Sequence, residues 1–315
     1  MKNRCLYCYH ELKTPDFGDF HRNCVKIFFG TEEPPKLEYS LNQMTDLARN
    51  VVERRIAVPG VQPKLSLSLV EGSLNEEGQR LTVIGALGGK YILKPPSETF
   101  PQMPENEHVT MRIAESFGIN TVLSSLIRLQ SGELSYITRR VDRTDANEKI
   151  HMLDMFQILE ATDKYKGSME RVGNAIGKYS GNTLLDKLYF FELAVFSFLT
   201  GNNDMHLKNF SLIRRGNLWT LSPAYDLLNV SIVNPDDDEE LALTLEGKKR
   251  KLTRKHFETL GLGLDLNKKQ ITRVLKRFMR NKNVAIDWIR NSFLSEEYQE
   301  KYLDLMESRY AILEE

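Results

Sequence analysis

The stretch Gly201-Asn-Asn-Asp-Met-His-Leu-Lys-Asn-Phe-Ser211 follows an apolar run and precedes a segment with the pattern of a β-strand. We therefore expect a loop held between two rigid elements. Asp204 and Asn209 in this loop are five positions apart. In phosphoryl transfer a carboxylate orients the acceptor hydroxyl, and an amide oxygen nearby can bind Mg2+. Taken alone, the same residues are equally compatible with a polar turn capped by Asn and Asp.

A second carboxylate stands shortly after this loop, in Ser222-Pro-Ala-Tyr225-Asp226. The segments 210–213 and 219–221 between the two motifs read as a strand pair around the turn Arg215-Gly-Asn217. Protein kinases place a metal-binding Asp across a hairpin from an Asp-x4-Asn catalytic loop. The alternative is that Asp226 is an ordinary aspartate in a turn and binds no metal.

Upstream of the loop, Lys94 ends the apolar strand pattern of Tyr91-Ile-Leu-Lys94. A Lys at the end of a strand can reach the α- and β-phosphates of a nucleotide, although alone it fits a Lys that extends to solvent at a sheet edge. Further upstream, Pro59-Gly60-Val61-Gln62-Pro63-Lys64 has one glycine and is a poor phosphate loop by the usual pattern. Its backbone N–H groups could still cover phosphates.

The cysteines form a separate pattern at the N-terminus, Cys5-x2-Cys8-x12-His21-x2-Cys24. Zn2+ prefers thiolate and imidazole ligands in a closed tetrahedral set, and such closed sites are structural. All three cysteines of the chain belong to this pattern, so we predict a structural zinc site. The alternative is three ordinary reduced thiols, and we interpret His10 as a bystander.

Composition is that of a globular protein. The chain has 315 residues, of which 41% are hydrophobic, and its formal net charge is zero. The apolar fraction excludes a disordered chain. The zero net charge argues against a globally basic nucleic-acid binder but leaves a local basic patch open. We find neither a membrane-spanning run nor a signal peptide and expect a soluble, cytoplasmic protein.

The pattern of elements predicts an α+β fold. Strand patterns prevail between Pro59 and Arg140, with helices over 36–56 and 105–117. Beyond His151 the chain reads as helical, over 154–161, 168–178, 183–200, 253–260, 267–292 and 296–312. We expect three parts: a zinc-knuckle-like segment over 1–34, a β-rich part over 35–150 and a helical part over 151–315.

The motifs together resemble the HipA-like serine/threonine kinases, the toxins of bacterial toxin–antitoxin modules. The resemblance extends from about residue 55 to the C-terminus. It rests on Pro59–Lys64, Tyr91-Ile-Leu-Lys-Pro95, Glu105-Asn-Glu107, Arg140-Val-Asp-Arg143, Gly201–Ser211 and Ser222–Asp226. It implies a two-lobed protein-kinase-like fold with a mixed, β-rich N-lobe and a mostly helical C-lobe.

The resemblance also implies roles. Asp204 would be the catalytic base, Asn209 and Asp226 would bind Mg2+, and Lys94 would contact the phosphates of ATP. The remaining nucleotide contacts would come from Pro59, Gly60, Val61, Gln62, Pro63 and Lys64, from Leu153 and Met155 where the hinge meets adenine, and from His206, Lys208 and Tyr225.

Two departures from the family concern regulation and partners. The stretch Arg55-Ile-Ala57-Val-Pro59-Gly60 has no hydroxyl where the family carries its autophosphorylated serine just before the loop glycine. Only about 55 residues precede the loop, which resembles short, split members (HipT-like) completed by a small HipS-like protein. The expected partners are a HipB-like helix-turn-helix antitoxin, with DNA reached only through it, and a protein substrate, for which the family suggests an aminoacyl-tRNA synthetase.

Three functions remain open at this level. The first is a serine/threonine protein kinase that uses ATP and Mg2+. The second is a catalytically silent interaction module with a kinase fold, against which the presence of Lys94, Asp204, Asn209 and Asp226 argues. The third is a small-molecule kinase, since phosphate chemistry does not choose the acceptor.

Overall fold

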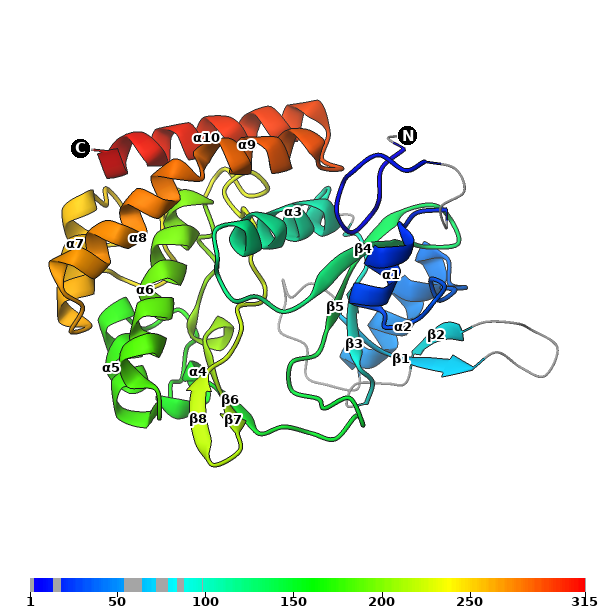
Figure 1. Cartoon of the computed structure of the whole chain (residues 1–315), viewed down its shortest axis with the longest axis horizontal. Helices are drawn as coiled ribbons and strands as arrows, with labels where there is room; N and C mark the ends of the chain where they lie inside the picture. The colour runs from blue at the N-terminus through cyan, green and yellow to red at the C-terminus, as the bar shows by residue number, and fades with distance from the viewer. Residues whose placement is uncertain are drawn as a thin grey trace. The chain divides into compact units, whose positions relative to one another are not determined.

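The computed structural model describes residues 3–13, 18–53, 64–71, 79–83, 88–97 and 99–314. The chain divides into two compact units (Figure 1). Unit 1 comprises Met1–His108, Val122–Asn147 and Asn291–Phe293, and unit 2 comprises Val109–Thr121, Glu148–Arg290 and Leu294–Glu315. Among the described residues, no helix is both long and apolar enough to cross a bilayer.

Unit 1 is built on a five-stranded antiparallel sheet with the order β2-β1-β3-β5-β4. The strands are β1 Leu65–Glu71, β2 Gln79–Val83, β3 Tyr91–Lys94, β4 Ser124–Arg128 and β5 Leu134–Arg139. Leu65 pairs with Leu93 at the centre, and both side chains are buried. The strands predicted in this part of the sequence are confirmed, and four successive residues of β4 and of β5 are buried, so both faces of these two strands are covered.

Three helices accompany this sheet: α1 Arg22–Phe28, α2 Leu41–Glu53 and α3 Met103–Ser116. The helix predicted over 36–56 is α2, and α1 was not predicted from the sequence. The N-terminal segment reaches the edge strand β4, because the Leu126 N–H donates to the Leu6 carbonyl at 3.2 Å. An ion pair between Arg128 and Asp19 at 2.9 Å joins the same two regions. The segment therefore packs on the sheet rather than standing apart from it.

Unit 2 is mostly helical. It contains α4 Met155–Ile158, α5 Met169–Tyr179, α6 Thr183–Leu199, α7 Arg254–Gly263, α8 Lys268–Arg280, α9 Lys282–Asn291 and α10 Glu296–Glu314. The central helix α6 contacts α5, α7, α10 and the strand β8 Leu218–Leu221 (Figure 1). From Phe190 to Leu199 every residue of α6 is buried, whereas Leu184, Leu185 and Tyr189 nearer its start are exposed. Such a helix forms the core of a helical unit.

A small antiparallel sheet completes unit 2, in the order β6-β7-β8, where β6 is Met152–Asp154 and β7 is Ser211–Arg215. The predicted strand pair is the β7–β8 hairpin. The strand β6 was predicted only as a hinge segment, because three residues show no periodicity. It pairs with β7 through Asp154 and Ser211.

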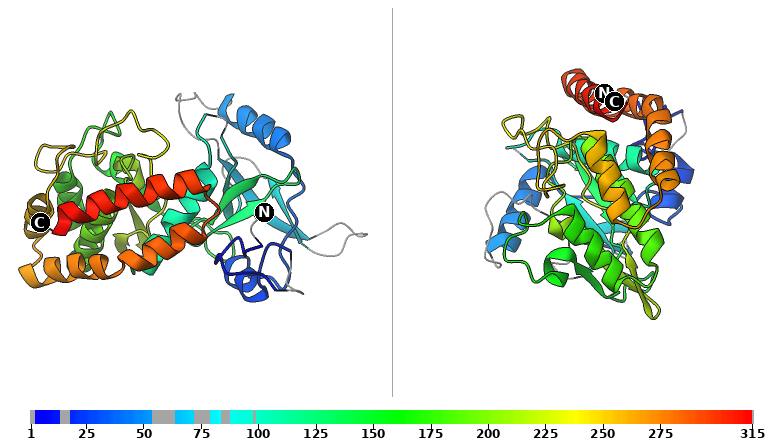
Figure 2. Two further views of the ribbon diagram at one scale, coloured as in Figure 1. Left: turned by 90° about the horizontal axis from the view of Figure 1, so that it is seen from above. Right: turned by 90° about the vertical axis from the view of Figure 1, so that its left-hand side faces the viewer.

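The single helix predicted over 267–292 is wrong. The chain forms two helices, α8 and α9, that change direction at Asn281 (Figure 2). The side-chain amide of Asn281 donates to the carbonyl of Ser116, at the end of α3, over 3.4 Å. A tertiary hydrogen bond of this kind leaves no periodic signal in the sequence.

Candidate functional site

The loop that follows α6 begins at a glycine that no other residue could replace without strain. Gly201 has φ +66°, and a Cβ there would lie 2.3 Å from Leu305 Cδ2 and 2.9 Å from Asn229 Oδ1. Before it, the hydroxyl of Thr200 closes the helix by donating to the Phe196 carbonyl. The chain therefore leaves α6 in a sharp turn with one fixed direction.

Asp204 is held by hydrogen bonds at both its side chain and its backbone. Its Oδ1 accepts a hydrogen bond of 2.7 Å from the Tyr165 hydroxyl. Its carbonyl accepts bonds from the His206 N–H at 2.8 Å and from Asn209 Nδ2 at 3.3 Å. The carboxylate is half-buried, so its orientation is set while it stays accessible.

Two neutral groups surround this carboxylate. Burial lowers the pKa of His206, and the charges of Asp204 and Asp226 oppose that shift without cancelling it. Burial also raises the pKa of Tyr165, and its hydrogen bond to Asp204 raises it further. The Tyr165 ring meets the His206 ring edge-on, with centroids 5.2 Å apart. Near neutral pH Tyr165 is thus a hydrogen-bond donor, and Asp204 is its acceptor.

Tyr225 ties the second acidic motif to the first. Its hydroxyl lies 2.5 Å from Ser211 Oγ and donates to the Lys208 carbonyl at 3.0 Å. Burial raises the pKa of Tyr225, so the hydroxyl keeps its proton. The next residue, Asp226, is half-buried and adopts φ +61°, a left-handed conformation that is rare outside glycine.

Asn209 is bound to the Asp204 loop, because its side-chain amide donates to the Asp204 carbonyl at 3.3 Å and its N–H to the His206 carbonyl at 2.9 Å. Asn209 is buried in the short 3-10 helix Leu207–Asn209, and the charges of Asp204 and Asp226 both act on His206. Carboxylate and amide oxygens are the ligands that Mg2+ prefers. Asp204, Asn209 and Asp226 are therefore the candidate oxygen ligands for a divalent cation in this unit.

The proposed adenine-contacting residues lie beside the same hairpin. The Met155 N–H donates to the Phe210 carbonyl at 2.8 Å, at the end of β6. Met155 is fully buried, whereas Leu153 is 40% exposed. Lys208 is exposed, with its ammonium 4.7 Å from the centre of the Phe156 ring. Of these residues, only Leu153 and Lys208 present side chains to solvent.

In unit 1, Lys94 ends β3 and forms a buried ion pair. Its Nζ lies 2.7 Å from Glu107 Oε1, and the two side chains are 11% and 1% exposed. The ammonium also lies 5.4 Å from the centre of the Tyr136 ring. Glu107, on α3, is part of the motif Glu105-Asn-Glu107, but sequence analysis assigned it no role. Protein kinases require such a Lys–Glu pair between a strand and a helix.

The segment Pro59–Pro63, expected to cover the nucleotide, lies outside the described residues, and so does Ala57. Lys64 is described: it is exposed and directly precedes β1.

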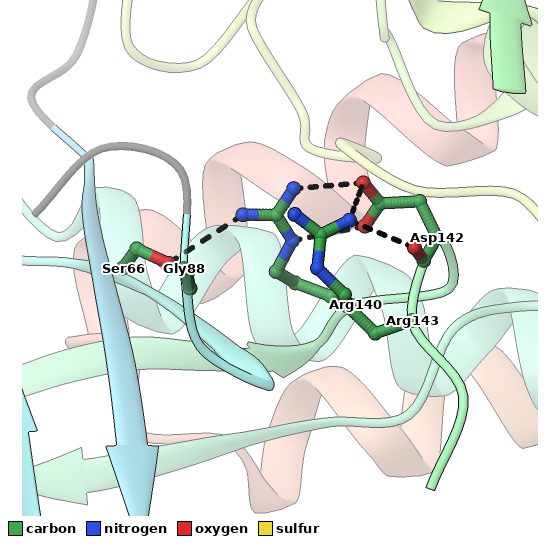
Figure 3. Close-up of polar contacts among 5 residues, drawn as sticks. All are labelled: Ser66, Gly88, Arg140, Asp142 and Arg143. Atoms are coloured by element: carbon green, nitrogen blue, oxygen red, sulfur yellow. Dashed lines mark hydrogen bonds and ion pairs between the residues drawn. The ribbon is translucent and has the colours of Figure 1, made fainter. Parts of the chain in front are cut away.

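Arg140, Asp142 and Arg143 form a compact charge cluster (Figure 3). Arg140 pairs with Asp142 through two hydrogen bonds of 2.9 and 2.7 Å, and Arg143 adds a third of 2.7 Å. Burial alone would raise the pKa of Asp142, but the two guanidinium groups outweigh it and lower the pKa. Arg140 also reaches Ser66 of β1, whose hydroxyl donates to the Gly88 carbonyl. This motif therefore fixes the chain after β5 against β1.

The four residues of the predicted zinc pattern come together, and we call them the Cys/His cluster. The ligand atoms of Cys5, Cys8, His21 and Cys24 all lie within 4.8 Å of one another. His21 Nδ1 is 3.4 Å from Cys8 Sγ and 3.9 Å from Cys24 Sγ. The pKa of Cys5 is strongly lowered, because the thiols of Cys24 and then Cys8 donate hydrogen bonds to it. Four ligand atoms at this spacing could hold a metal ion.

The surroundings of the cluster set the tautomer of its histidine. His21 Nε2 lies 3.1 Å from the Glu11 carbonyl, which can only accept. The proton is therefore on Nε2, and Nδ1 presents its lone pair to the thiols. Histidines that bind metals typically donate their other N–H in this way.

Comparison with known proteins places the chain in a family. Its residues 56–286 match the model of the HipA-like C-terminal domain. The solved HipA of Shewanella oneidensis, in its complex with HipB and operator DNA, superposes with a TM-score of 0.67 at 22% identity over 81% of this chain and 64% of that one. The Helicobacter pylori proinflammatory kinase CtkA superposes with a TM-score of 0.54 at 18% identity, over 79% of this chain and 94% of the CtkA chain. The fold is thus the α+β, kinase-like fold expected from the sequence.

The chain belongs to the HipA-like C-terminal domain family. A protein named "Putative kinase Y4dM" from Sinorhizobium fredii is 31% identical over 77% of this chain and 60% of its own length. A "Putative kinase" from Haemophilus influenzae is 28% identical over 62% of this chain and 59% of its own length. The "Serine/threonine-protein kinase toxin HipA" of Shewanella oneidensis is 26% identical over 61% and 47%. The chain spans about half to three fifths of the length of these relatives.

Proposed function

We propose that this protein is a serine/threonine protein kinase that transfers the γ-phosphate of ATP to a protein hydroxyl. The proposal rests on the hydrogen bonds that hold the Asp204 loop: Tyr165 donates to the Asp204 carboxylate, and the Asn209 side chain donates to the Asp204 carbonyl. Membership of the HipA-like family and the kinase names of its relatives support it. A silent module would have no need of this constellation.

Each residue then has a chemical task. Asp204 would accept the proton of the acceptor hydroxyl as that oxygen bonds to the γ-phosphorus and the bond from phosphorus to the leaving ADP breaks, and Tyr165 keeps the Asp204 carboxylate oriented. Asn209 and Asp226 bind Mg2+, which neutralises phosphate charge when present. Lys94, with its ammonium oriented by Glu107, contacts the α- and β-phosphates. Pro59 to Lys64 cover the nucleotide, and Leu153, Met155, His206, Lys208 and Tyr225 complete its surroundings.

We further propose that the kinase acts as the toxin of a toxin–antitoxin module. The similar Shewanella oneidensis HipA is solved in complex with HipB and operator DNA, which supports a HipB-like antitoxin as partner. The expected HipS-like protein and aminoacyl-tRNA synthetase substrate rest on the family resemblance alone. Co-purification of the chain with the product of a neighbouring reading frame would test the antitoxin.

For the Cys/His cluster we propose Zn2+. Three thiols and one imidazole form a soft, closed ligand set that matches Zn2+ better than Mg2+ or Ca2+. Cysteines in this state persist in a reducing compartment, and we place the protein in the cytoplasm. The cluster is part of unit 1 and supplies no group to the chemistry proposed above.

Incubation of the protein with γ-labelled ATP and Mg2+ in a cell extract tests the function. We expect label on a protein. Label on a metabolite would identify a small-molecule kinase, and the absence of any Mg2+-dependent label would identify a silent module.

A further inference from the structure

The residue that follows the second cysteine of the Cys/His cluster has an unusual backbone. Tyr9 adopts φ +62°, a left-handed conformation that costs a bulky residue energy. Its N–H donates to the Cys5 carbonyl at 2.9 Å, while the Cys5 N–H donates to the His10 carbonyl at 2.9 Å. The turn that carries Cys5 and Cys8 thus determines where the Tyr9 side chain points. Such conformations persist only where their surroundings impose them.

The Tyr9 side chain is directed at α3. Its hydroxyl and His108 Nδ1 share a hydrogen bond of 2.8 Å, and both residues are buried, at 2% and 0% exposure. The two rings also meet edge-on at 5.2 Å. On its other side, the Tyr9 ring packs edge-on against Phe293 at 5.3 Å. Tyr9 is therefore clamped between α3 and the segment that follows α9.

His108 is the next residue after Glu107, the partner of Lys94. Successive residues of an α-helix are rotated by about 100°, so a contact that fixes His108 also fixes the rotation of this turn and the direction of Glu107. The Lys94–Glu107 pair is buried and 2.7 Å long. A small rotation of the turn would lengthen it.

We infer that the Cys/His cluster positions Glu107 against Lys94 through Tyr9 and His108. Metal in the cluster keeps the left-handed turn, the turn holds Tyr9, and Tyr9 fixes the α3 turn that carries Glu107. Tyr9 and His108 are positioning residues, because neither is part of the proposed chemistry. The consequence for ATP rests on the proposed role of Lys94, whereas the effect on α3 does not.

Hydrogen exchange of the zinc-loaded protein tests the effect on α3. In Tyr9→Phe, which keeps the ring and loses the hydroxyl, we expect amides around Asn106 to exchange on the order of 5–30 times faster, as for a local loss of one or two kcal/mol. Removal of zinc from the wild type should give at least the same change. His10→Ala, at the exposed neighbouring position, is the matched control and should not change it. Unchanged exchange in both Tyr9→Phe and the zinc-free protein would overturn the inference.

A second pair of variants separates positioning from general stability. His108→Asn places an amide oxygen near the position of Nδ1, whereas His108→Leu removes the acceptor. We expect ATP affinity, measured by calorimetry at equal zinc content, to fall about 5–30-fold in His108→Leu and to recover in His108→Asn. Equal affinities in the two variants would contradict positioning through the hydrogen bond. If the wild type binds no ATP, the proposed function fails, and hydrogen exchange alone decides this inference.

Discussion

At the scale of single residues, the site depends on side chains whose protonation is set by burial. Tyr165 and Tyr225 keep their protons because burial raises the pKa of each, and His206 stays neutral because burial lowers its pKa. The carboxylates therefore carry the charge of the site, with neutral hydrogen-bonding groups around them. This division suits a site that must attract a cation and accept one proton.

Loss of an oxygen proposed to bind Mg2+ should weaken nucleotide binding only when Mg2+ is present. For Asn209→Ala and for Asp226→Asn we expect the affinity for Mg2+–ATP to fall about tenfold or more, and the affinity for ATP in EDTA to change little. Lys94→Ala should lower both affinities, because its charge acts on the phosphates directly. Calorimetry with and without Mg2+ checks this. If all three variants lose ATP affinity equally in EDTA and in Mg2+, Asn209 and Asp226 do not bind the metal.

Glu105 on α3 should make stability depend on pH. Burial raises its pKa from its ordinary value of 4.5 to about 7. Between these values the folded state binds more protons than the unfolded state, so the stability contributed by this residue falls as pH rises through the window. We expect Glu105→Gln to match the wild type in Tm near pH 5 and to exceed it near pH 8. Thermal unfolding at both values measures this, with Glu115→Gln on the same helix as the control. A Tm difference that does not grow with pH would contradict the assignment.

At the scale of elements, the direction in which the chain leaves α6 places the whole Asp204 loop. Gly201 and Gly216 both have positive φ, but only Gly201 lies against other atoms. A Cβ added at Gly216, in the hairpin turn, would have no other atom within 4 Å. Substitutions at these two glycines therefore separate the free-energy cost of a left-handed side-chain residue from the cost of steric overlap.

Gly201→Ala should destabilise the protein more than Gly216→Ala. A left-handed alanine costs roughly 1–2 kcal/mol, which is the whole effect expected at Gly216. At Gly201 the overlap with Leu305 and Asn229 adds about 1–3 kcal/mol. Urea unfolding measures both losses of stability, provided that the free energy of unfolding depends on urea concentration as steeply in the variants as in the wild type. Equal losses would show that the contact with α10 relaxes freely.

At the scale of the whole molecule, the Cys/His cluster lies outside the part of the chain that the family model covers. The family model matches residues 56–286, whereas the Cys/His cluster lies before them. The segment that carries the cluster is bound to the sheet through Leu6 and Asp19 and to α3 through Tyr9. We interpret it as an integral part of unit 1.

The purified protein should therefore contain one Zn2+ per chain. Cys8→Ser should lower the zinc content and cost several kcal/mol of stability, since binding to such a cluster is coupled to folding. His10→Ala should affect neither. Elemental analysis of protein prepared without chelator measures the content. A content near zero, with freely titratable thiols, would show three ordinary cysteines.

Sequence reasoning reached the motifs and most elements, and it failed where distant contacts decide. The Cys/His cluster and the β7–β8 hairpin follow from local spacing and turn chemistry, so both could be predicted. The break at Asn281 depends on Ser116, far away in the chain. The pairing of Glu107 with Lys94 and the contacts of Tyr165 and Tyr9 arise only when the chain folds. The roles assigned to Pro59–Pro63 stay predictions.

The central claim is that Asp204 is the base of a phosphoryl-transfer reaction. The most direct measurement is the rate of Mg2+-dependent transfer from labelled ATP in Asp204→Asn, compared with Asp236→Asn on an exposed loop. We predict a fall of about 10²–10⁴-fold at Asp204, with ATP affinity and Tm retained, and a wild-type rate for the control. Transfer at an undiminished rate in Asp204→Asn would contradict the account.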